Sequence, residues 1–269
     1  MEFRIEKEDG IATITLCQPK KLNALSVDGL RAYGEAIAAL TEDDTVRAII
    51  VTGEGRAFCV GADLSSILGY AREGDSDKVS ADAMDKVMRE GAGYMAAQIR
   101  ACTKPTVAAV NGVVAGGGLT LALGCDVVLS VENASFNAPF VPGLGIVPDC
   151  GSSWLLTRLA GTGRALPTIL LGEPIPAQKA LDWGMIWEIV DADDLMTRAI
   201  KLARRLAAGP IRTHADVRDA VEAATQHSFT EHLELERKAN VELAQLSNFT
   251  EGVNAFIEKR APKFSAKRD

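Results

Sequence analysis

The chain of 269 residues is long enough for one large domain or two modest ones and can bury a sizeable core. Its composition, 47% hydrophobic and 24% charged, is that of an ordinary soluble globular protein. The 36 acidic and 29 basic side chains give a net charge of −7 at pH 7, whereas surfaces that bind nucleic acid are usually strongly basic. We therefore expect no nucleic-acid partner.

The cysteines and the first residues bear on the compartment. The five cysteines are odd in number and lie in no CxxC pair, so they indicate neither a disulfide framework nor a zinc site: Cys17, Cys59, Cys102, Cys125 and Cys150. Residues 1–10 carry charges where a signal peptide needs an apolar core. We expect reduced thiols and a cytoplasmic protein.

The first half of the chain predicts alternating strands and helices. Residues 2–9 and 11–17 alternate apolar and polar side chains across Gly10, which is typical of a β-hairpin. Ser26 can cap a helix that runs to about Leu40. Further along we expect a buried strand at 46–52, a surface loop at 65–80, where no apolar period is present, and a helix at 81–102 that ends before Pro105.

The stretch from Val107 to Cys125 contains no charged residue, a length that could suggest a membrane span. An asparagine, a threonine and five glycines dilute its apolar character, and Asp126 follows at once, so we expect no span. The pattern instead predicts a buried strand, a turn, and a helix opened by Gly116-Gly117-Gly118. Without Cβ atoms there, a ligand or another backbone can approach closely, and the unpaired N–H groups of the first helical turn favour negative charge.

The second half changes character near residue 209. Before it we expect short strands, a shaped loop with three prolines, and helices: strands at 127–131 and 134–136, helices at 152–159, 165–171, 177–183 and 194–207. After it we expect helices alone, near 212–225, 229–247 and 249–259, with a capping box at Ser228 and Glu231. The sequence thus predicts an α/β core at 1–208 and a helical region at 209–269.

Several kinds of site are not supported. The three histidines, His214, His227 and His232, lie in the helical region without the spacing of metal ligands, and no Ser-His-Asp triad is indicated. The run GEGRAFCVG lacks the G-x-G-x-x-G spacing of a dinucleotide site, and GTGRAL is not followed by the residues of a P-loop. We expect no metal.

Two glycine-containing turns remain, Gly61-Ala62 and Gly116-Gly117-Gly118, each after an expected strand. Either turn alone can be explained by close backbone packing. Together they can supply two convergent N–H donors for oxygen charge that develops during a reaction, and one such donor is typically worth about 3 kcal/mol of barrier.

Four motifs resemble the crotonase superfamily of enoyl-CoA hydratases and isomerases: LNALS at 22–26, FCVGADL at 58–64, AVNGVVAGGGLTLALGCDVV at 109–128 and FIEKRAPKF at 256–264. The resemblance covers nearly the whole chain in order. It implies a spiral of ββα units with a C-terminal helical region that trimerises, and hence a homotrimer or a dimer of trimers. It also implies a coenzyme A thioester as substrate and no prosthetic group.

The resemblance carries residue roles with it. It implies that the N–H groups of Ala62 and Gly117 bind the thioester oxygen. Coenzyme A would be held largely by backbone at Leu22, Asn23, Ala24, Ala62, Asp63 and Leu64. Its phosphates would lie near basic residues, for which the chain offers Lys259, Arg260, Lys263, Lys267 and Arg268, although these can equally form a solvated tail.

The position of the acid/base group separates members of the family. Where hydratases carry two glutamates, this chain has Thr120 and Phe140, and neither exchanges a proton near neutral pH. Asp149 is the carboxylate within the shaped loop, although it can also serve as a turn or N-cap residue before the helix at Ser152. Apolar neighbours, for which Phe140, Val141 and Leu144 are candidates, would raise its pKa toward the working range.

The segments LGIVPDCGSSWLL, LGEP and WGMIW are similar to the branch of ring-1,2-epoxyphenylacetyl-CoA isomerases and Δ3,Δ2-enoyl-CoA isomerases, in which this aspartate is the acid/base. Ser152-Ser153 and Gly117-Gly118-Leu119 depart from that pattern. Aryl-CoA dehalogenases use the aspartate with a core histidine, and no histidine precedes His214. We expect an acyl-CoA isomerase; the alternatives are an enoyl-CoA hydratase and a non-catalytic acyl-CoA-binding or assembly subunit.

Overall fold

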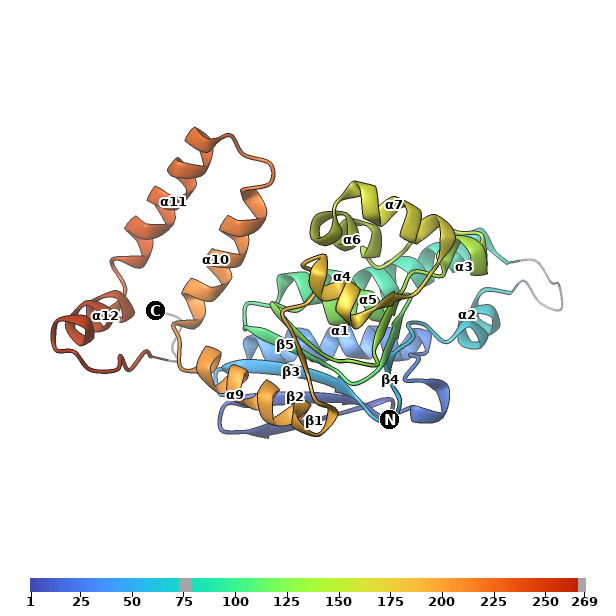
Figure 1. The fold of residues 1–269 in the computed structure, drawn as a ribbon, viewed down its shortest axis with the longest axis horizontal. Helices are drawn as coiled ribbons and strands as arrows, with labels where there is room; N and C mark the ends of the chain where they lie inside the picture. The colour runs from blue at the N-terminus through green and yellow to red at the C-terminus, as the bar shows by residue number, and fades with distance from the viewer. Residues whose placement is uncertain (73–78, 266–269) are drawn as a thin grey trace.

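The computed structural model describes residues 1–72 and 79–265 and contains two β-sheets (Figure 1). The larger has six strands in the order β1-β2-β3-β5-β7-β10, which are parallel except for the β1–β2 pair: Phe3–Glu8, Ile11–Leu16, Ala48–Gly53, Thr106–Val110, Val127–Val131 and Glu188–Val190. The smaller has the order β4-β6-β8-β9: Ala57–Cys59, Val113–Ala115, Ser135–Asn137 and Ile175–Pro176.

The chain visits the two sheets alternately. β3, β5 and β7 lie side by side in the large sheet, and each is followed at once by a strand of the small sheet, namely β4, β6 and β8. Helical segments then lead back to the next large-sheet strand. These repeated ββα units form the spiral that the resemblance implies.

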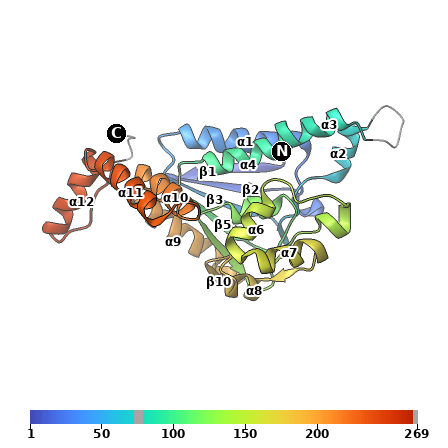
Figure 2. The ribbon, with the colours of Figure 1, turned by 90° about the horizontal axis from the view of Figure 1, so that it is seen from above.

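Helices cover the large sheet and fill the connections between units. The helix α9 packs against β3, β5 and β7, while α1 packs along α4 on the other side of the sheet (Figure 2). The helices of residues 1–208 are α1 Val27–Glu42, α2 Leu64–Ala71, α3 Ala81–Lys86, α4 Tyr94–Ala101, α5 Gly118–Leu123, α6 Ser152–Ala160, α7 Thr162–Leu171, α8 Ala177–Asp182 and α9 Leu195–Ala207, with π-helical turns at Val87–Gly93 and Phe140–Leu144. In the described part of the chain, no helix is both long enough and apolar enough to cross a membrane.

Local signals in the sequence predict the first elements correctly. Asp9 and Gly10 both have positive φ, which suits a two-residue hairpin turn between β1 and β2. The Ser26 side chain accepts a hydrogen bond from Gly29 N and caps α1 as predicted. The helix expected at 81–102 is present as α3, a π-helical turn and α4 in succession.

The expectation of a loop at 65–80 was wrong in its first part, because α2 begins at Leu64. The Asp63 carboxylate caps this helix by accepting hydrogen bonds from Ser65 N and Ser66 N, at 3.0 and 3.4 Å. Leu64, Ile67 and Leu68 have the i, i+3, i+4 spacing of an apolar helix face, and with the cap they were the usable signal. The remainder of that prediction falls on residues 73–78, which lie outside the described residues.

The last three helices form an arm that extends from the core, and this all-helical ending confirms the prediction: α10 Ile211–Ala223, α11 Phe229–Leu243 and α12 Ser247–Ile257 (Figure 1). The capping box of Ser228 and Glu231 is present at the start of α11. Arg218 ties α10 to the core: its guanidinium donates two hydrogen bonds to Asp126 at 2.7 Å and further ones to the carbonyls of Cys102 and Lys104.

We predict that Arg218→Ala destabilises the protein by about 2–3 kcal/mol, because it removes one member of a partly buried, hydrogen-bonded charge pair. Arg212→Ala on the same helix is the matched control and should cost under about 1 kcal/mol, since its ion pairs are largely exposed. Urea unfolding of the two variants checks this, and equal losses would contradict it.

Candidate functional site

The first part of the candidate site is pinned by a buried asparagine. Asn23 is fully buried, and Leu22 and Asn23 both have left-handed backbone conformations. The Asn23 side chain accepts a hydrogen bond from Gln18 N and donates to the carbonyls of Glu54 and Ala57, all at 2.8–3.0 Å. Satisfying a buried amide in this way stabilises one conformation of the turn.

The turn at 22–25 is joined to the turn that follows β4. Leu25 N donates to Gly61 O at 2.9 Å, and Leu25 O accepts from Asp63 N at 2.7 Å, which makes a parallel bridge between Leu25 and Ala62. In such a bridge the second residue's own N–H and C=O point away from the first. The Ala62 N–H therefore points away from Leu25, and it has no hydrogen-bond partner among the described residues.

The turn at Gly61 touches the start of α5 backbone to backbone. A Cβ added at Gly118 would lie 2.2 Å from Cys59 O, and one added at Gly61, where φ is +91°, would lie 2.7 Å from Gly117 N. Only glycine allows this contact. Gly117 is the N-cap of α5, and within the described chain no protein acceptor faces its N–H, as is usual at a helix start.

Asp63 and Leu64 also lie at this junction. Besides capping α2, the Asp63 carboxylate accepts a hydrogen bond from Lys21 Nζ at 2.6 Å. The Lys21 ammonium and the cap hydrogen bonds hold the pKa of Asp63 well below its usual range. The Asp63 carboxylate is therefore engaged within the protein. The groups left for contact with a ligand here are the Asp63 backbone and the half-exposed Leu64 side chain.

Asp149 belongs to the turn that precedes α6, and this turn contacts the start of α5 through Cys150. The next residue, Cys150, is nearly buried, and its Sγ would be 3.1 Å from a Cβ added at Gly117. Burial raises the pKa of Asp149 above its ordinary value; hydrogen bonds from the Cys150 thiol and from its own N–H partly offset this effect. Asp149 is not the cap of α6, whose N-cap residue is Gly151.

The two positions where hydratases carry glutamates are buried here. Thr120 is 2% exposed and donates a hydrogen bond from its hydroxyl to Cys150 O at 2.7 Å. Phe140 is 3% exposed, whereas Val141 is half-buried and Leu144 is exposed. Of the three residues expected to surround Asp149 with apolar groups, only Phe140 is fully part of the core.

The structure brings together most of the predicted site but leaves the basic tail apart. Leu22, Asn23, Ala24, Ala62, Asp63, Leu64 and Gly117 meet at the junction described above. Lys259 follows α12, at the opposite end of the molecule from α2 (Figures 1 and 2). Arg260 pairs with Glu251 at 2.6 Å and with Glu258, and Lys267 and Arg268 lie outside the described residues.

Sequence reasoning missed the contacts that join these segments. The hydroxyl of Thr120 and the backbone turn at Cys150 connect α5 to the Asp149 turn, and no pattern in the sequence pairs them. The positive φ of Gly61, Cys150 and Gly151 could be suspected only at the glycines. Among the described residues, no group of three or more His, Cys, Asp or Glu side chains could hold a metal ion.

Comparison with known proteins now places the chain. Residues 6–267 match the enoyl-CoA hydratase/isomerase family. The chain is 37% identical to 1,2-epoxyphenylacetyl-CoA isomerase of Escherichia coli (strain K12), over 99% of this chain and 100% of that protein. It is 36% identical to enoyl-CoA hydratase ACTT3 of Alternaria alternata, over 95% of this chain and 83% of that protein.

Solved structures agree with this assignment. The crystal structure of an enoyl-CoA hydratase from Polaromonas sp. JS666 superposes with a TM-score of 0.88 at 30% identity, over 98% of this chain and 99% of that one. The chain therefore belongs to the enoyl-CoA hydratase/isomerase family and has the crotonase fold. It is an enzyme of that family, whose members act on thioesters of coenzyme A without a prosthetic group.

We predict that Gly61→Ala destabilises the protein by about 2 kcal/mol or more, because the new Cβ would meet Gly117 N and the backbone would keep a positive φ. Gly69→Ala in α2 is the matched control: nothing lies within 4 Å of its added Cβ, so its effect should be neutral or stabilising by up to about 1 kcal/mol. Chemical unfolding of both variants checks the contact, and an unaffected Gly61→Ala would contradict it.

Proposed function

We propose that the protein is a coenzyme A thioester isomerase that uses a backbone oxyanion hole and Asp149 as its single acid/base. The observation that carries the proposal is a partly desolvated carboxyl, Asp149, next to Cys150, whose Sγ packs against Gly117, in a chain where both hydratase glutamates are replaced, by Thr120 and Phe140. The similarity to an epoxyphenylacetyl-CoA isomerase supports the same assignment.

In the proposed reaction the N–H groups of Ala62 and Gly117 donate to the thioester oxygen. They stabilise the negative charge of the enolate, and donors of this kind each contribute about 3 kcal/mol. The Asp149 carboxylate takes a proton from one carbon of the acyl chain, the C–H electron pair moves into the conjugated system, and the proton returns to another carbon. The double bond shifts, and Asp149 ends ionised as it began.

A ring epoxide on the acyl group is a second substrate class for the same groups. As an epoxide C–O bond breaks, its electron pair goes to the oxygen, which takes the proton of protonated Asp149; the carboxylate then takes a proton back from the ring intermediate, so the product is an isomer of the substrate. Burial raises the pKa of Asp149 and so favours the protonated form that this step needs. The coenzyme A moiety would lie along Leu22–Ala24 and Ala62–Leu64, where the two turns are joined by backbone hydrogen bonds.

We predict that Asp149→Asn lowers the isomerisation rate by about 10²–10⁴-fold, the usual contribution of a general acid/base. A panel of 3-enoyl-CoA and 2-enoyl-CoA thioesters in deuterated water measures double-bond shift, hydration and exchange at the α- and γ-carbons. On acidification of the wild type, proton abstraction should begin to slow at a pH above about 3.9, the ordinary pKa of an aspartate. The reason is that a raised pKa keeps the Asp149 carboxyl protonated, and so unable to accept a proton, up to a higher pH.

Two results would separate the rival functions. Hydration that outpaces isomerisation in the wild type would identify a hydratase that uses Asp149 with a water. Thioester turnover that is absent in both the wild type and Asp149→Asn, with coenzyme A affinity intact, would identify a binding or assembly subunit. Turnover that is unchanged in Asp149→Asn would show that Asp149 is not the acid/base. Gly69→Ala serves as the control that leaves every proposed group in place.

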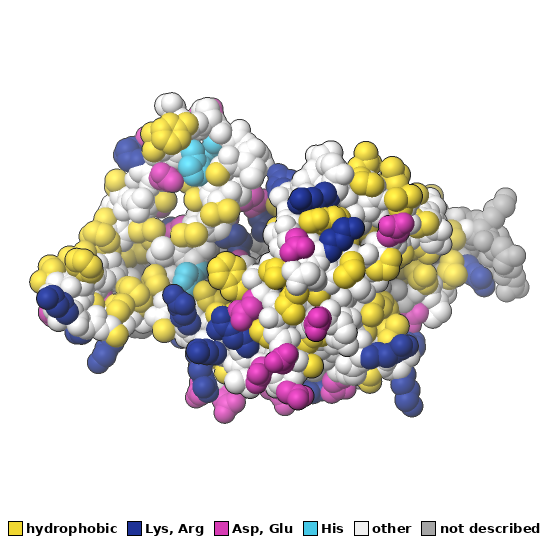
Figure 3. Space-filling view, in the orientation of Figure 1, with side chains coloured by type: hydrophobic (Ala, Val, Ile, Leu, Met, Phe, Trp, Pro, Cys, Tyr) yellow, Lys and Arg dark blue, Asp and Glu magenta, His cyan; other side chains and the backbone are white. Residues whose placement is uncertain are grey.

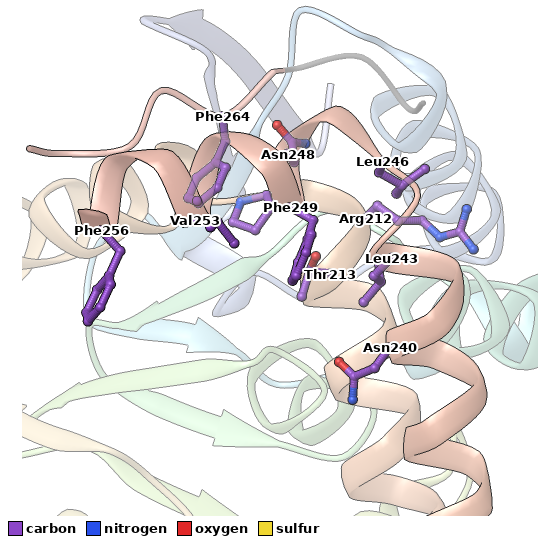
Figure 4. Close-up of a pocket in the computed structure, with 12 residues that line it drawn as sticks. Arg212, Thr213, Asn240, Leu243, Leu246, Asn248, Phe249, Val253, Phe256 and Phe264 are labelled. Atoms are coloured by element: carbon purple, nitrogen blue, oxygen red, sulfur yellow. The ribbon is translucent and has the colours of Figure 1, made fainter. Parts of the chain in front are cut away.

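We also propose that the arm of residues 209–269 is an assembly unit that forms a homotrimer or a dimer of trimers. Its helices expose large apolar side chains that a lone chain leaves in water (Figure 3): Val217, Val221, Phe229, Leu233, Val241, Phe249, Phe256 and Ile257. A cavity of about 410 Å³ opens among α10, α11 and α12, lined by Leu243, Phe249, Val253 and Phe264 (Figure 4). Because Lys259 is remote from its own chain's site, a role in binding phosphate requires the arm of a second copy.

We predict a mass in solution of three or six times the 28.6 kDa of one chain, measured by light scattering. Phe256→Glu should lower that mass. Phe256 is 85% exposed in the single chain, and the substitution would place a charged carboxylate in the proposed contact. Ile5→Glu on the exposed side of β1 is the control and should leave it unchanged. A monomeric wild type would refute the proposal.

The odd number of free cysteines also favours a reducing, cytoplasmic setting.

A further inference from the structure

The turn that presents Asp149 has an unfavourable backbone. Cys150 has a φ of +52°, a left-handed conformation in which a residue with a Cβ is strained, and Gly151 follows with a φ of +78°. Strain of this kind persists only where surrounding contacts enforce it. The contacts of this turn are therefore informative.

The turn is held by two buried hydroxyl groups. Thr120 Oγ1 donates to Cys150 O at 2.7 Å and lies 3.5 Å from Ser152 Oγ. Thr120 is 2% exposed and Ser152 is completely buried. Ser152 N also donates to Asp149 O at 2.9 Å, so the backbone is fixed on both sides of Cys150.

Thr120 belongs to the same helical turn as the proposed oxyanion donor. Thr120 N donates to Gly117 O at 3.1 Å, so the two residues are one turn apart in α5. A side chain on this rigid turn thus determines where the Asp149 backbone lies relative to Gly117 N. A shift of about 1 Å between reacting groups can cost about 10²-fold in rate.

We propose that Thr120 is a positioning residue that fixes the Asp149 turn against the oxyanion end of α5 through its hydrogen bond to the Cys150 carbonyl. The inference rests on the proposed function of Asp149 and Gly117. It gives a different role to the position at which hydratases carry a glutamate. The hydroxyl proton of Thr120 is committed to the carbonyl of Cys150, so the group holds the base instead of acting as one.

The test compares Thr120→Val with Thr120→Ser and with a matched control elsewhere. Thr52 is a buried threonine in β3 whose Oγ1 donates to Ala109 O at 2.8 Å, so Thr52→Val deletes the same kind of bond outside the site. We expect Thr120→Val to lower kcat by about 10–10²-fold with little change in KM. Thr120→Ser should keep kcat within about threefold, because it keeps the donor, and Thr52→Val should leave kcat unchanged.

Two further measurements separate positioning from a general structural role. If Thr120 acts through Asp149, the double variant Thr120→Val/Asp149→Asn should be no slower than Asp149→Asn alone. The acid limb of the rate profile should move to lower pH in Thr120→Val, because a looser turn lets water reach the carboxyl.

Each outcome has a definite meaning. Equal losses in Thr120→Val and Thr52→Val, an equal loss in Thr120→Ser, or an additive double variant would overturn the positioning role. A wild-type rate in Asp149→Asn would instead overturn the proposed function itself. Thermal unfolding of all variants identifies a loss of rate that comes from misfolding. If Thr120→Val is misfolded, the rate of Thr120→Ser, which keeps the hydroxyl donor, tests the positioning role.

Discussion

The close contact between two glycine-containing turns is the constraint on which the site depends. The carbonyl group of Cys59 occupies the space that any side chain at residue 118 would need. The contact exists because β4 and β6 are neighbours in the small sheet, so their following turns emerge together. At this helix start the Gly117 N–H has no acceptor among the described residues. The adjoining N–H of Ala62 is available for a related reason, since Leu25 uses the opposite side of that strand.

In the proposed function, three side chains decide the reaction, and overall sequence identity does not give them extra weight. Relatives named as an isomerase and as a hydratase match the chain at 37% and 36% identity, so similarity alone separates the family from others but not its reactions. The side chains at 120, 140 and 149 differ in what they can do with a proton. A threonine whose hydroxyl already donates to a carbonyl and a buried phenylalanine leave one partly desolvated carboxyl.

Sequence patterns predicted what depends on neighbours in the chain. The hairpin, the cap of α1, the capping box of α11 and the glycine-opened helix all follow from residues a few positions apart, and the structure confirms each. The helix α2 was missed because it has only eight residues, so that its cap at Asp63 and the apolar spacing of Leu64, Ile67 and Leu68 extend over about two turns. The hydrogen bond between Thr120 and Cys150 could not be predicted, because it joins residues thirty positions apart through a backbone atom that every residue possesses. The distance of Lys259 from the site is likewise a property of how the arm leaves the core.

The alternation of the chain between two sheets has a consequence for how such enzymes diversify. The turn before α2 comes from the first ββα unit, the start of α5 from the second, and the Asp149 turn from the third. Each of these three turns therefore follows a different strand of the small sheet, namely β4, β6 or β8. If these groups have the proposed roles, replacing the third turn would change the acid/base group while the two turns that hold the thioester oxygen stay in place. One fold can then acquire a new reaction through changes in a single loop, while its thioester-binding turns stay unchanged.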